Sequence, residues 1–239
     1  MVQVFTYAER PDLSDRVGEV LDSWPEFIHH ADVTQLHWHK LREELPELQL
    51  VLYDEERDVV VGRGQTIPAS AWSGLPGGVD DVLDRRFGSG PREEPDVLCA
   101  LVAIVDERRR GEGLSAAIIE GMRSAAAAAG LRELIAPVRP TWKERYPLTP
   151  LERYAHWTRD DGLPFDPWIR LHARLGAELA EVCAESMRVT GTVAEWEEWT
   201  GLRFPEDGEY VVRGALVPVT FAERIGVYVE PNVWMRHPV

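Results

Sequence analysis

The chain has 239 residues, of which 44% are hydrophobic, and its 41 acidic residues against 26 basic ones give a formal net charge of −15 at pH 7. This composition supports a sizeable core, while the negative charge argues against nucleic-acid binding and the lack of any apolar stretch near about 18 residues argues against a membrane span. The amino terminus shows no secretory signal, and Cys99 and Cys183 do not suggest a disulfide framework, so we expect a reduced, cytoplasmic protein.

The first segment of the chain predicts an edge strand followed by two helices. Residues 2–6 alternate between apolar and polar side chains, as a strand at a sheet edge does. Apolar residues between Leu13 and Trp24 fall on one face of a helix. A second helix is expected from Asp32 to about Glu44, where Pro46 ends it.

A β-hairpin is expected next. Strand-like runs cover residues 48–53 and 59–67, and a polar turn joins them. A short helix near 82–87 and a loop then lead to residue 97. The histidines of this half form no ligand spacing with Cys or Asp that is typical of zinc, so we expect no metal site. They are His29, His30, His37 and His39.

The centre of the chain predicts a strand, a turn, a helix and a second strand. A continuous apolar run from Val97 to Val105 is typical of a strand buried on both faces. After a turn of charged residues and glycines, an alanine-rich segment with high helix propensity ends at Gly130. The second apolar run covers residues 134–138.

The turn before this helix has the chemistry of an anion site. Gly111 and Gly113 lack Cβ atoms, so the backbone can bend sharply and an anion can approach its N–H groups. The helix that begins there has unpaired N–H groups and a dipole that favours negative charge. The three arginines at 108–110 add positive charge, and Ser115 adds a hydroxyl. These features predict a cradle for a diphosphate, with a solvated basic turn as the alternative.

The pattern Arg108-x-x-Gly111-x-Gly113, placed between a strand and a helix, resembles the Q/R-x-x-G-x-G/A signature of the GNAT superfamily, the acetyl-CoA-dependent N-acetyltransferases. A Rossmann site fits worse because no G-x-G-x-x-G is present, and a P-loop would need G-K-[ST]. The resemblance implies a mixed α/β (α+β) fold with a splayed central β-sheet flanked by helices. It also implies that acetyl-CoA, or another acyl-CoA, lies in the splay as co-substrate, with its pantetheine arm paired to the first strand. The cofactor-binding residues implied are Leu101, Val102, Ala103, Arg108, Arg109, Arg110, Gly111, Glu112, Gly113, Leu114 and Ser115.

A long insertion and a second motif follow the second strand. Residues 139–165 are rich in proline and aromatic side chains, and we interpret them as a lid over the site. The segment from Leu171 to Ala177 resembles the GNAT helix-end motif aromatic-Tyr-x-x-Leu-Gly-Phe, with His172 in place of the tyrosine. The resemblance implies that His172 protonates the departing thiolate, while a buried structural histidine is the alternative. Tyr146, in the insertion, is the second candidate for this acid.

The carboxy-terminal region predicts a further elaboration of the same domain. Thr192 and Glu195 form a capping box that opens a short helix closed by Gly201. Strands are expected at 211–212, 216–219 and 227–229, in the elaboration 190–239. We therefore predict one domain over 1–239. Its core motif region is 97–177.

These features together predict an enzyme that transfers an acyl group from acyl-CoA to a small amine by direct attack on the thioester. Some relatives carry a glutamate as general base where this chain has Val97, so the base is left open. Two alternatives keep the fold: an acyl-thioester decarboxylase or S-acyltransferase, and a non-catalytic module that binds acyl-CoA. The expected partners are coenzyme A and the amine, without nucleic acid or membrane, and a homodimer is left open.

Overall fold

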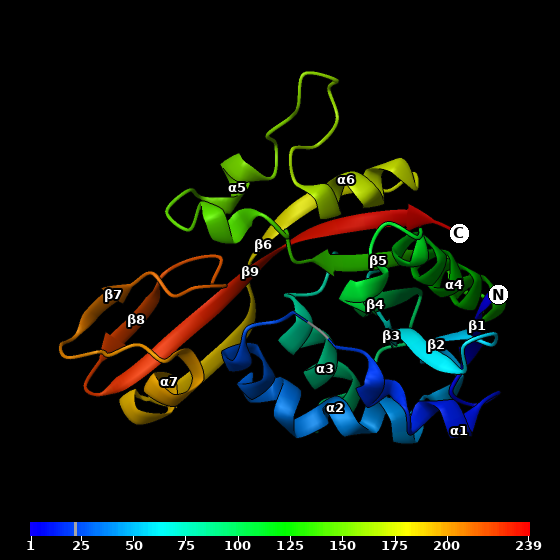
Figure 1. Cartoon of the computed structure of the whole chain (residues 1–239), viewed down its shortest axis with the longest axis horizontal. Coiled ribbons are helices and arrows are strands. Elements are labelled where there is room, and N and C mark those ends of the chain that lie inside the picture. The colour runs from blue at the N-terminus through cyan, green and yellow to red at the C-terminus, as the bar shows by residue number, and fades with distance from the viewer. Residues whose placement is uncertain (22) are drawn as a thin grey trace.

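The computed structural model describes residues 1–21 and 23–239. Its strands form one nine-stranded sheet in the order β1-β2-β3-β4-β5-β9-β8-β7, with β6 paired to β9. Among the described strands β4 and β5 run parallel, and the other neighbours run antiparallel. Figure 1 shows a compact half built on β1–β5 and a long two-stranded ribbon, β6 with β9, that leaves it. The predicted mixed sheet flanked by helices is therefore confirmed.

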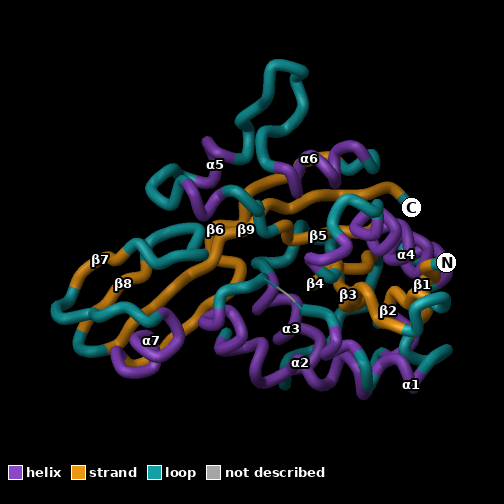
Figure 2. The backbone as a smooth tube through the Cα atoms, viewed as in Figure 1, coloured by secondary structure: helices purple, strands orange, loops and turns teal. Residues whose placement is uncertain are grey.

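The first half of the sheet follows the predicted order. β1 (Val2–Thr6) pairs with β2 (Leu50–Asp54), and β2 forms the expected hairpin with β3 (Val59–Ala69). The helix α2 (Asp32–Glu44) has the predicted bounds, and α3 (Val79–Phe87) begins three residues before the predicted helix. Figure 2 shows α2 and α3 together along one side of the sheet.

The helix predicted between Leu13 and Trp24 is wrong. The structure has a short α1 (Pro11–Ser14) and a 3₁₀ turn at Val17–Glu19, and Asp22 within the predicted helix lies outside the described residues. Leu13 and Val20 are nevertheless buried, against Val51 and Val60 of the sheet. Burial of these side chains thus accounts for the apolar pattern without a helix.

The central unit was predicted closely. β4 (Val97–Val105), α4 (Leu114–Ala128) and β5 (Glu133–Val138) succeed one another, and Gly130 has the left-handed φ of +71° expected just after a helix. α4 packs tightly on the sheet, since a Cβ at its Gly121 would lie 3.0 Å from a side-chain atom of Val4. This helix therefore holds the turn before it at the carboxyl end of β4.

Two short helices and the ribbon make up the rest of the chain. A hydrophobic cluster that includes Leu151 and Ile169 joins the two helices to β5 and β9. The ribbon ends in a small antiparallel group with a terminal helix, far from α4 (Figure 1). The elements are α5 (Leu151–Tyr154), α6 (Pro167–Arg174), β6 (Glu178–Thr192), α7 (Val193–Thr200), β7 (Gly208–Tyr210), β8 (Val219–Ala222) and β9 (Ile225–Pro238).

The tail confirms its predicted helix and the strand predicted at 227–229, which lies within β9, and it corrects the other two strands. Thr192 and Glu195 form both hydrogen bonds of the capping box, and Gly201 ends the helix with φ +69°. The strands predicted at 211–212 and 216–219 are misplaced. Most of these residues lie in the connection between β7 and β8, and the two strands that pair with each other lie on either side of that connection. The long β6 was not predicted, since many of its side chains are exposed and charged. No helix in the described ranges has both the length and the apolar character that crossing a membrane requires.

Candidate active site

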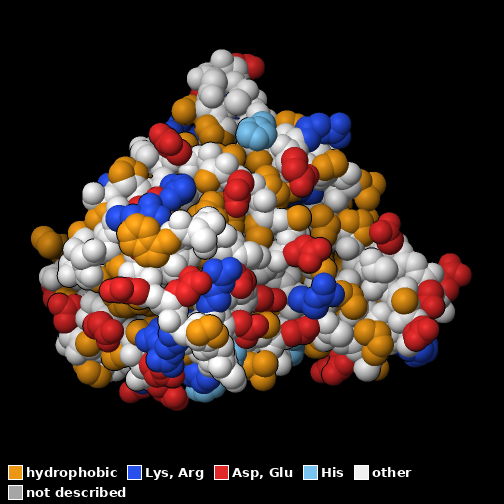
Figure 3. All heavy atoms as spheres, turned by 180° about the vertical axis from the view of Figure 1, so that it is seen from behind, with side chains coloured by type: hydrophobic (Ala, Val, Ile, Leu, Met, Phe, Trp, Pro, Cys, Tyr) orange, Lys and Arg blue, Asp and Glu red, His pale blue; other side chains and the backbone are white. Residues whose placement is uncertain are grey.

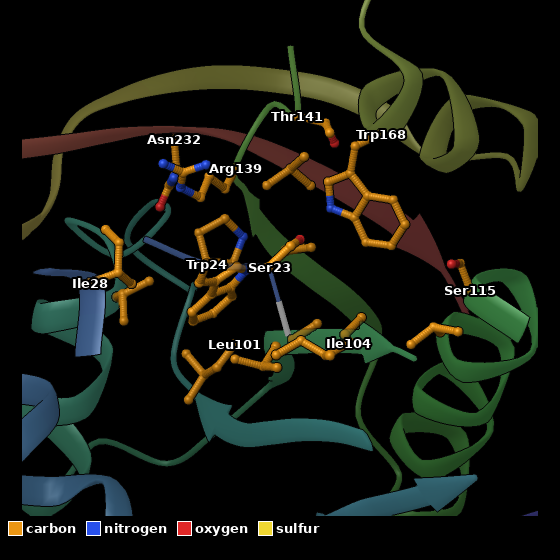
Figure 4. Close-up of a pocket in the computed structure, with 18 of the residues that line it drawn as sticks. Ser23, Trp24, Ile28, Leu101, Ile104, Ser115, Arg139, Thr141, Trp168 and Asn232 are labelled. Atoms are coloured by element: carbon orange, nitrogen blue, oxygen red, sulfur yellow. The ribbon is translucent and has the colours of Figure 1, made fainter. Parts of the chain in front are cut away.

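A cavity of about 910 Å³ opens where β4 and β5 separate. Its walls come from these two strands, from the start of α4, from α6 and from the segment before α2. Figure 4 shows Ser115 at one end and Ile28, Arg139 and Asn232 at the other, with Trp24 and Trp168 between them. The cavity thus runs across the sheet from the anion turn to β9.

The separation of the strands leaves one backbone edge of β4 open. Among the described residues, β4 pairs with β5 at Leu98 and Cys99 alone, whereas its other edge pairs with β3 as far as Val105. The register with β3 shifts by one residue at Leu101, which is a β-bulge that bends the strand. The predicted Leu101, Val102 and Ala103 all line the cavity. An extended ligand with amide groups can pair with this edge as an added strand would.

The turn before α4 has the backbone on which the predicted anion site depends. Gly111 and Gly113 have φ of +87° and +78°, and Gly113 is the N-cap of α4 without a side-chain cap. Among the described residues no acceptor is present for the N–H groups of Leu114 and Ser115. A Cβ at either glycine would meet no protein atom within 4 Å. Glycine is therefore required for the left-handed backbone, not for space inside the protein.

The three arginines of the turn have different roles. Arg110 lines the cavity and is 67% exposed, with its guanidinium 3.6 Å from the Glu107 carboxylate and 3.4 Å from the Ser23 hydroxyl. Arg108 instead turns back to Asp106, where its Nε donates to the carboxylate at 2.8 Å, and that interaction holds the pKa of Asp106 below its usual range.

Arg109 is held still more firmly. It bridges Glu112 at 2.7 Å and Asp54 at 3.1 Å. Hydrogen bonds from Arg57 and then from Arg109 lower the pKa of Asp54 to about 2. Arg109 thus ties the turn to β2, and Arg110 is the arginine of the turn that lines the cavity.

His172 lies on α6 in the cavity wall, but its environment differs from the expected one. Its ring is 3% exposed, and its Nδ1 lies 2.8 Å from Nε2 of His237, the next-to-last residue of β9. Burial, and secondarily His237, lower the pKa of His172 to about 3. The imidazolium expected as the acid is therefore not the form that the structure favours near pH 7.

Tyr146, the second candidate acid, packs away from the cavity. Its ring contacts Trp157 at 5.0 Å and Tyr154 at 5.9 Å between centroids, and Tyr146 is not among the described residues that line the cavity. The buried Lys143 fixes this part of the insertion, since its Nζ donates to the carbonyls of Tyr146 and Leu216.

The start of the insertion does reach the cavity, whereas the loop between α5 and α6 projects outward (Figure 1). The lining residues from the insertion are Arg139, Thr141, Trp142, Glu144 and Arg145.

Sequence reasoning missed a buried ion pair at the far end of the cavity. Arg139 Nε donates to Glu230 Oε2 at 2.9 Å, and the Tyr228 hydroxyl donates to the same oxygen at 2.9 Å. Burial and then Glu230 raise the pKa of Tyr228, which keeps its hydroxyl protonated as a donor. Among the described residues no donor is present for Glu230 Oε1, and Glu230 lines the cavity together with Asn232. Their strand, β9, is brought here by pairing with β5.

No carboxylate replaces the glutamate of relatives at the start of β4. Val97 is fully buried, and the neighbouring Asp96 accepts hydrogen bonds from the N–H of Ala71 at 2.6 Å and from Arg132 at 2.5 Å. The carboxylates in the described part of the cavity wall are instead Glu107, Glu144 and Glu230. Within residues 1–21 and 23–239 no group of three or more His, Cys, Asp or Glu side chains is placed to hold a metal ion.

Known proteins resemble the chain over its whole length. No protein-family model matches it. The arginine N-acetyltransferase avaD of Aspergillus versicolor is 30% identical to it over 270 residues, which cover 98% of this chain and 93% of the relative. Two solved structures share the fold over all of this chain and 98% of their own, at 15% and 16% identity and TM-scores of 0.61 and 0.56. They are the loading GNATL domain of CurA from Lyngbya majuscula and the GphF GNAT-like decarboxylase in complex with isobutyryl-CoA.

The buried histidine pair predicts a specific loss of stability in acid. Burial, and then the charge of Arg123, lower the pKa of His237 to about 4, so both histidines have folded pKa values below the ordinary 6.5. As pH falls through 6.5 the unfolded chain therefore binds protons before the folded chain does, and stability present above that pH is lost toward about pH 4. Each histidine contributes up to about 1.4 kcal/mol per pH unit to this slope.

Denaturant unfolding between pH 6.5 and 4.5 measures that slope. The variant carrying His172→Phe and His237→Leu should lose stability less steeply than wild type, whatever its stability at pH 7. His156→Leu, at an exposed histidine, is the control and should keep the wild-type slope. Equal slopes in all three proteins would contradict a buried neutral pair.

Proposed function

Because the chain belongs to the GNAT superfamily of acyl-CoA-dependent N-acyltransferases, we propose that it transfers the acetyl group of acetyl-CoA to an amine of a small cationic compound, with arginine or an arginine derivative as the first candidate. The observation that carries this proposal is a cavity with different groups at its two ends. The open edge of β4 and the uncapped start of α4 lie at one end, and a buried carboxylate lies at the other. The first two features suit the co-substrate and the third suits the acceptor.

Coenzyme A is assigned to the part of the cavity between β4 and α4. The amides of its pantetheine arm would pair with the backbone of β4 near Leu101 and Ala103. Its diphosphate would lie against the N–H groups of Leu114 and Ser115, where the helix dipole favours an anion. Arg110 adds a full positive charge beside them. In this arrangement the thioester lies deeper in the cavity, toward α6.

The acceptor is assigned to the end of the cavity at β9. Both hydrogen bonds to Glu230 fall on Oε2, so Oε1 can accept from an ammonium or guanidinium group. Trp24 forms part of the wall here, and its ring suits a cation. The formal charge of −15 favours the approach of a cation, and acidic side chains are spread among basic ones over the face shown in Figure 3. The name of the curated relative agrees with a cationic amine.

The reaction needs a neutral amine and a stabilised leaving group. An alkyl ammonium with pKa about 10.4 is neutral in about one molecule in a few thousand at pH 7, which costs about 4–5 kcal/mol. The amine nitrogen attacks the thioester carbonyl carbon, the C–S bond breaks, and the electron pair leaves on sulfur. The thiol of the product has a pKa near about 8.5, so the sulfur needs little acid assistance.

Release of free thiol from acetyl-CoA tests the function directly. Arginine should support release and yield an N-acetyl product by mass, whereas citrulline, which replaces the guanidinium by a neutral urea, should be a much poorer acceptor. Thiol release at the same rate without any amine would contradict the proposal. Decarboxylation of malonyl-CoA without N-acylation would indicate the thioester-decarboxylase alternative. Tight binding of coenzyme A without turnover of any acceptor would indicate a binding module.

The two exposed arginines of the turn offer a matched pair of variants for the co-substrate site. Arg110→Gln should weaken coenzyme A binding by about tenfold at low salt, since it removes a charge that faces the cavity, and the effect should shrink as salt rises. Arg108→Gln should weaken it by less than about threefold, because Asp106 already engages that guanidinium. Calorimetric titration with coenzyme A at two salt concentrations gives both affinities. A larger loss in Arg108→Gln than in Arg110→Gln would reverse the assignment.

A further inference from the structure

Two buried histidines face one another where α6 crosses β9. Nδ1 of His172 lies 2.8 Å from Nε2 of His237, and the rings are 3% and 0% exposed. The remaining nitrogens, His172 Nε2 and His237 Nδ1, are buried and have no hydrogen-bond partner in the described part of the chain. His172 is also part of the cavity wall. Its ring packs edge to face with the ring of Trp168, at 4.9 Å between centroids. The His172 ring is thus part of the cavity wall and carries a nitrogen that no described residue engages.

The two facing nitrogens share one proton, so the tautomers of the two rings are coupled. If His237 donates, its Nε2 carries the proton, His172 Nδ1 accepts, and His172 must carry its own proton on Nε2. If His172 donates, both rings must carry their protons on Nδ1 instead. The imidazole side chain intrinsically favours the Nε2–H tautomer. The first arrangement puts both rings in that form, and the second puts neither in it.

We propose that His237 is a positioning residue that donates from its Nε2 to His172 Nδ1 and thereby fixes His172 as a neutral Nε2–H donor toward the thioester sulfur in the cavity. This inference rests on the proposed function, which supplies the thioester that His172 would contact. His172 is then a catalytic residue, because it touches the reacting sulfur, and His237 acts through it.

The role conserves protons and charge. When the amine attacks and the C–S bond breaks, the electron pair goes to sulfur, and the His172 N–H group donates a hydrogen bond to the negative charge that develops there. The proton that the sulfur finally binds is the one that the amine nitrogen loses, so His172 starts and ends neutral. A preorganised donor of this kind can contribute about 10²–10³ in kcat.

Nitrogen-15 NMR of the full chain reads the tautomers without any turnover. A protonated and an unprotonated imidazole nitrogen resonate far apart, and His172→Gln and His237→Gln assign the two rings among the seven histidines. The result expected at pH 7 is a proton on Nε2 of both rings, with a shift of the His172 Nε2–H signal on addition of coenzyme A. Protons on Nδ1 of both rings would overturn the proposal, because His172 would then be an acceptor toward the cavity. An unmoved His172 signal with coenzyme A bound would overturn the contact with sulfur.

Two substitutions of His237 separate positioning from packing. His237→Leu removes the donor and should lower kcat by about 10- to 100-fold while the KM for acetyl-CoA changes little. His237→Gln carries an N–H donor at nearly the same reach and should recover most of that loss. Equal kcat in the two variants, at equal folded fraction by circular dichroism, would make His237 a packing residue. If wild type acetylates no amine, the kinetic arm reports failure of the proposed function, and the NMR arm still decides the tautomer.

Discussion

The rest of the structure depends on a strand that leaves its partner. β4 pairs with β5 at Leu98 and Cys99 and then separates from it, although a buried backbone donor or acceptor without a partner is costly. The bulge at Leu101 bends β4 near this point, and α4 packs on the sheet and places its uncapped amino end at the mouth of the gap. β9 pairs with the edge of β5 that faces away from β4, so β9 does not fill the gap between β4 and β5. A ligand with backbone-like amides and an anionic end satisfies both unpaired sets of groups.

Charged side chains line both ends of this gap. At the α4 end, close carboxylates engage Arg108 and Arg109, whereas Arg110 lines the cavity with a longer contact, 3.6 Å, to Glu107. At the β9 end a carboxylate is held by Arg139 and Tyr228 with one oxygen left over. The buried His172, whose pKa burial lowers, is part of the same cavity wall. In the proposed arrangement the anionic co-substrate lies toward the α4 end and the cationic acceptor toward the β9 end, and a hydrogen bond to a developing thiolate is strong where the bound ligands exclude water.

Local patterns in the sequence predicted what local chemistry determines. The strand, turn and helix from Val97 to Gly130 are specified by an apolar run, two glycines with positive φ and an alanine-rich helix, all close in sequence. The roles of Arg108 and His172 were harder to predict, because Asp106 and His237 change them and His237 reaches His172 through pairing of β9 with β5. The role of Glu230 could not be predicted for the same reason, because a single glutamate in the carboxy-terminal region belongs to no sequence motif. Motif spacing thus predicted the place of the site and not the long-range partners that set its protonation and charge.

A crystal structure with acetyl-CoA bound tests the central claim most directly. The account predicts that the pantetheine amides hydrogen-bond to the backbone of β4 between Leu101 and Ala103, and that the diphosphate accepts hydrogen bonds from the N–H groups of Leu114 and Ser115. The thioester sulfur would then lie within hydrogen-bond distance of His172 Nε2. A cofactor bound elsewhere, or a β4 edge that remains free while acetyl-CoA occupies the cavity, would contradict the claim that the splayed strand is the acyl-CoA site.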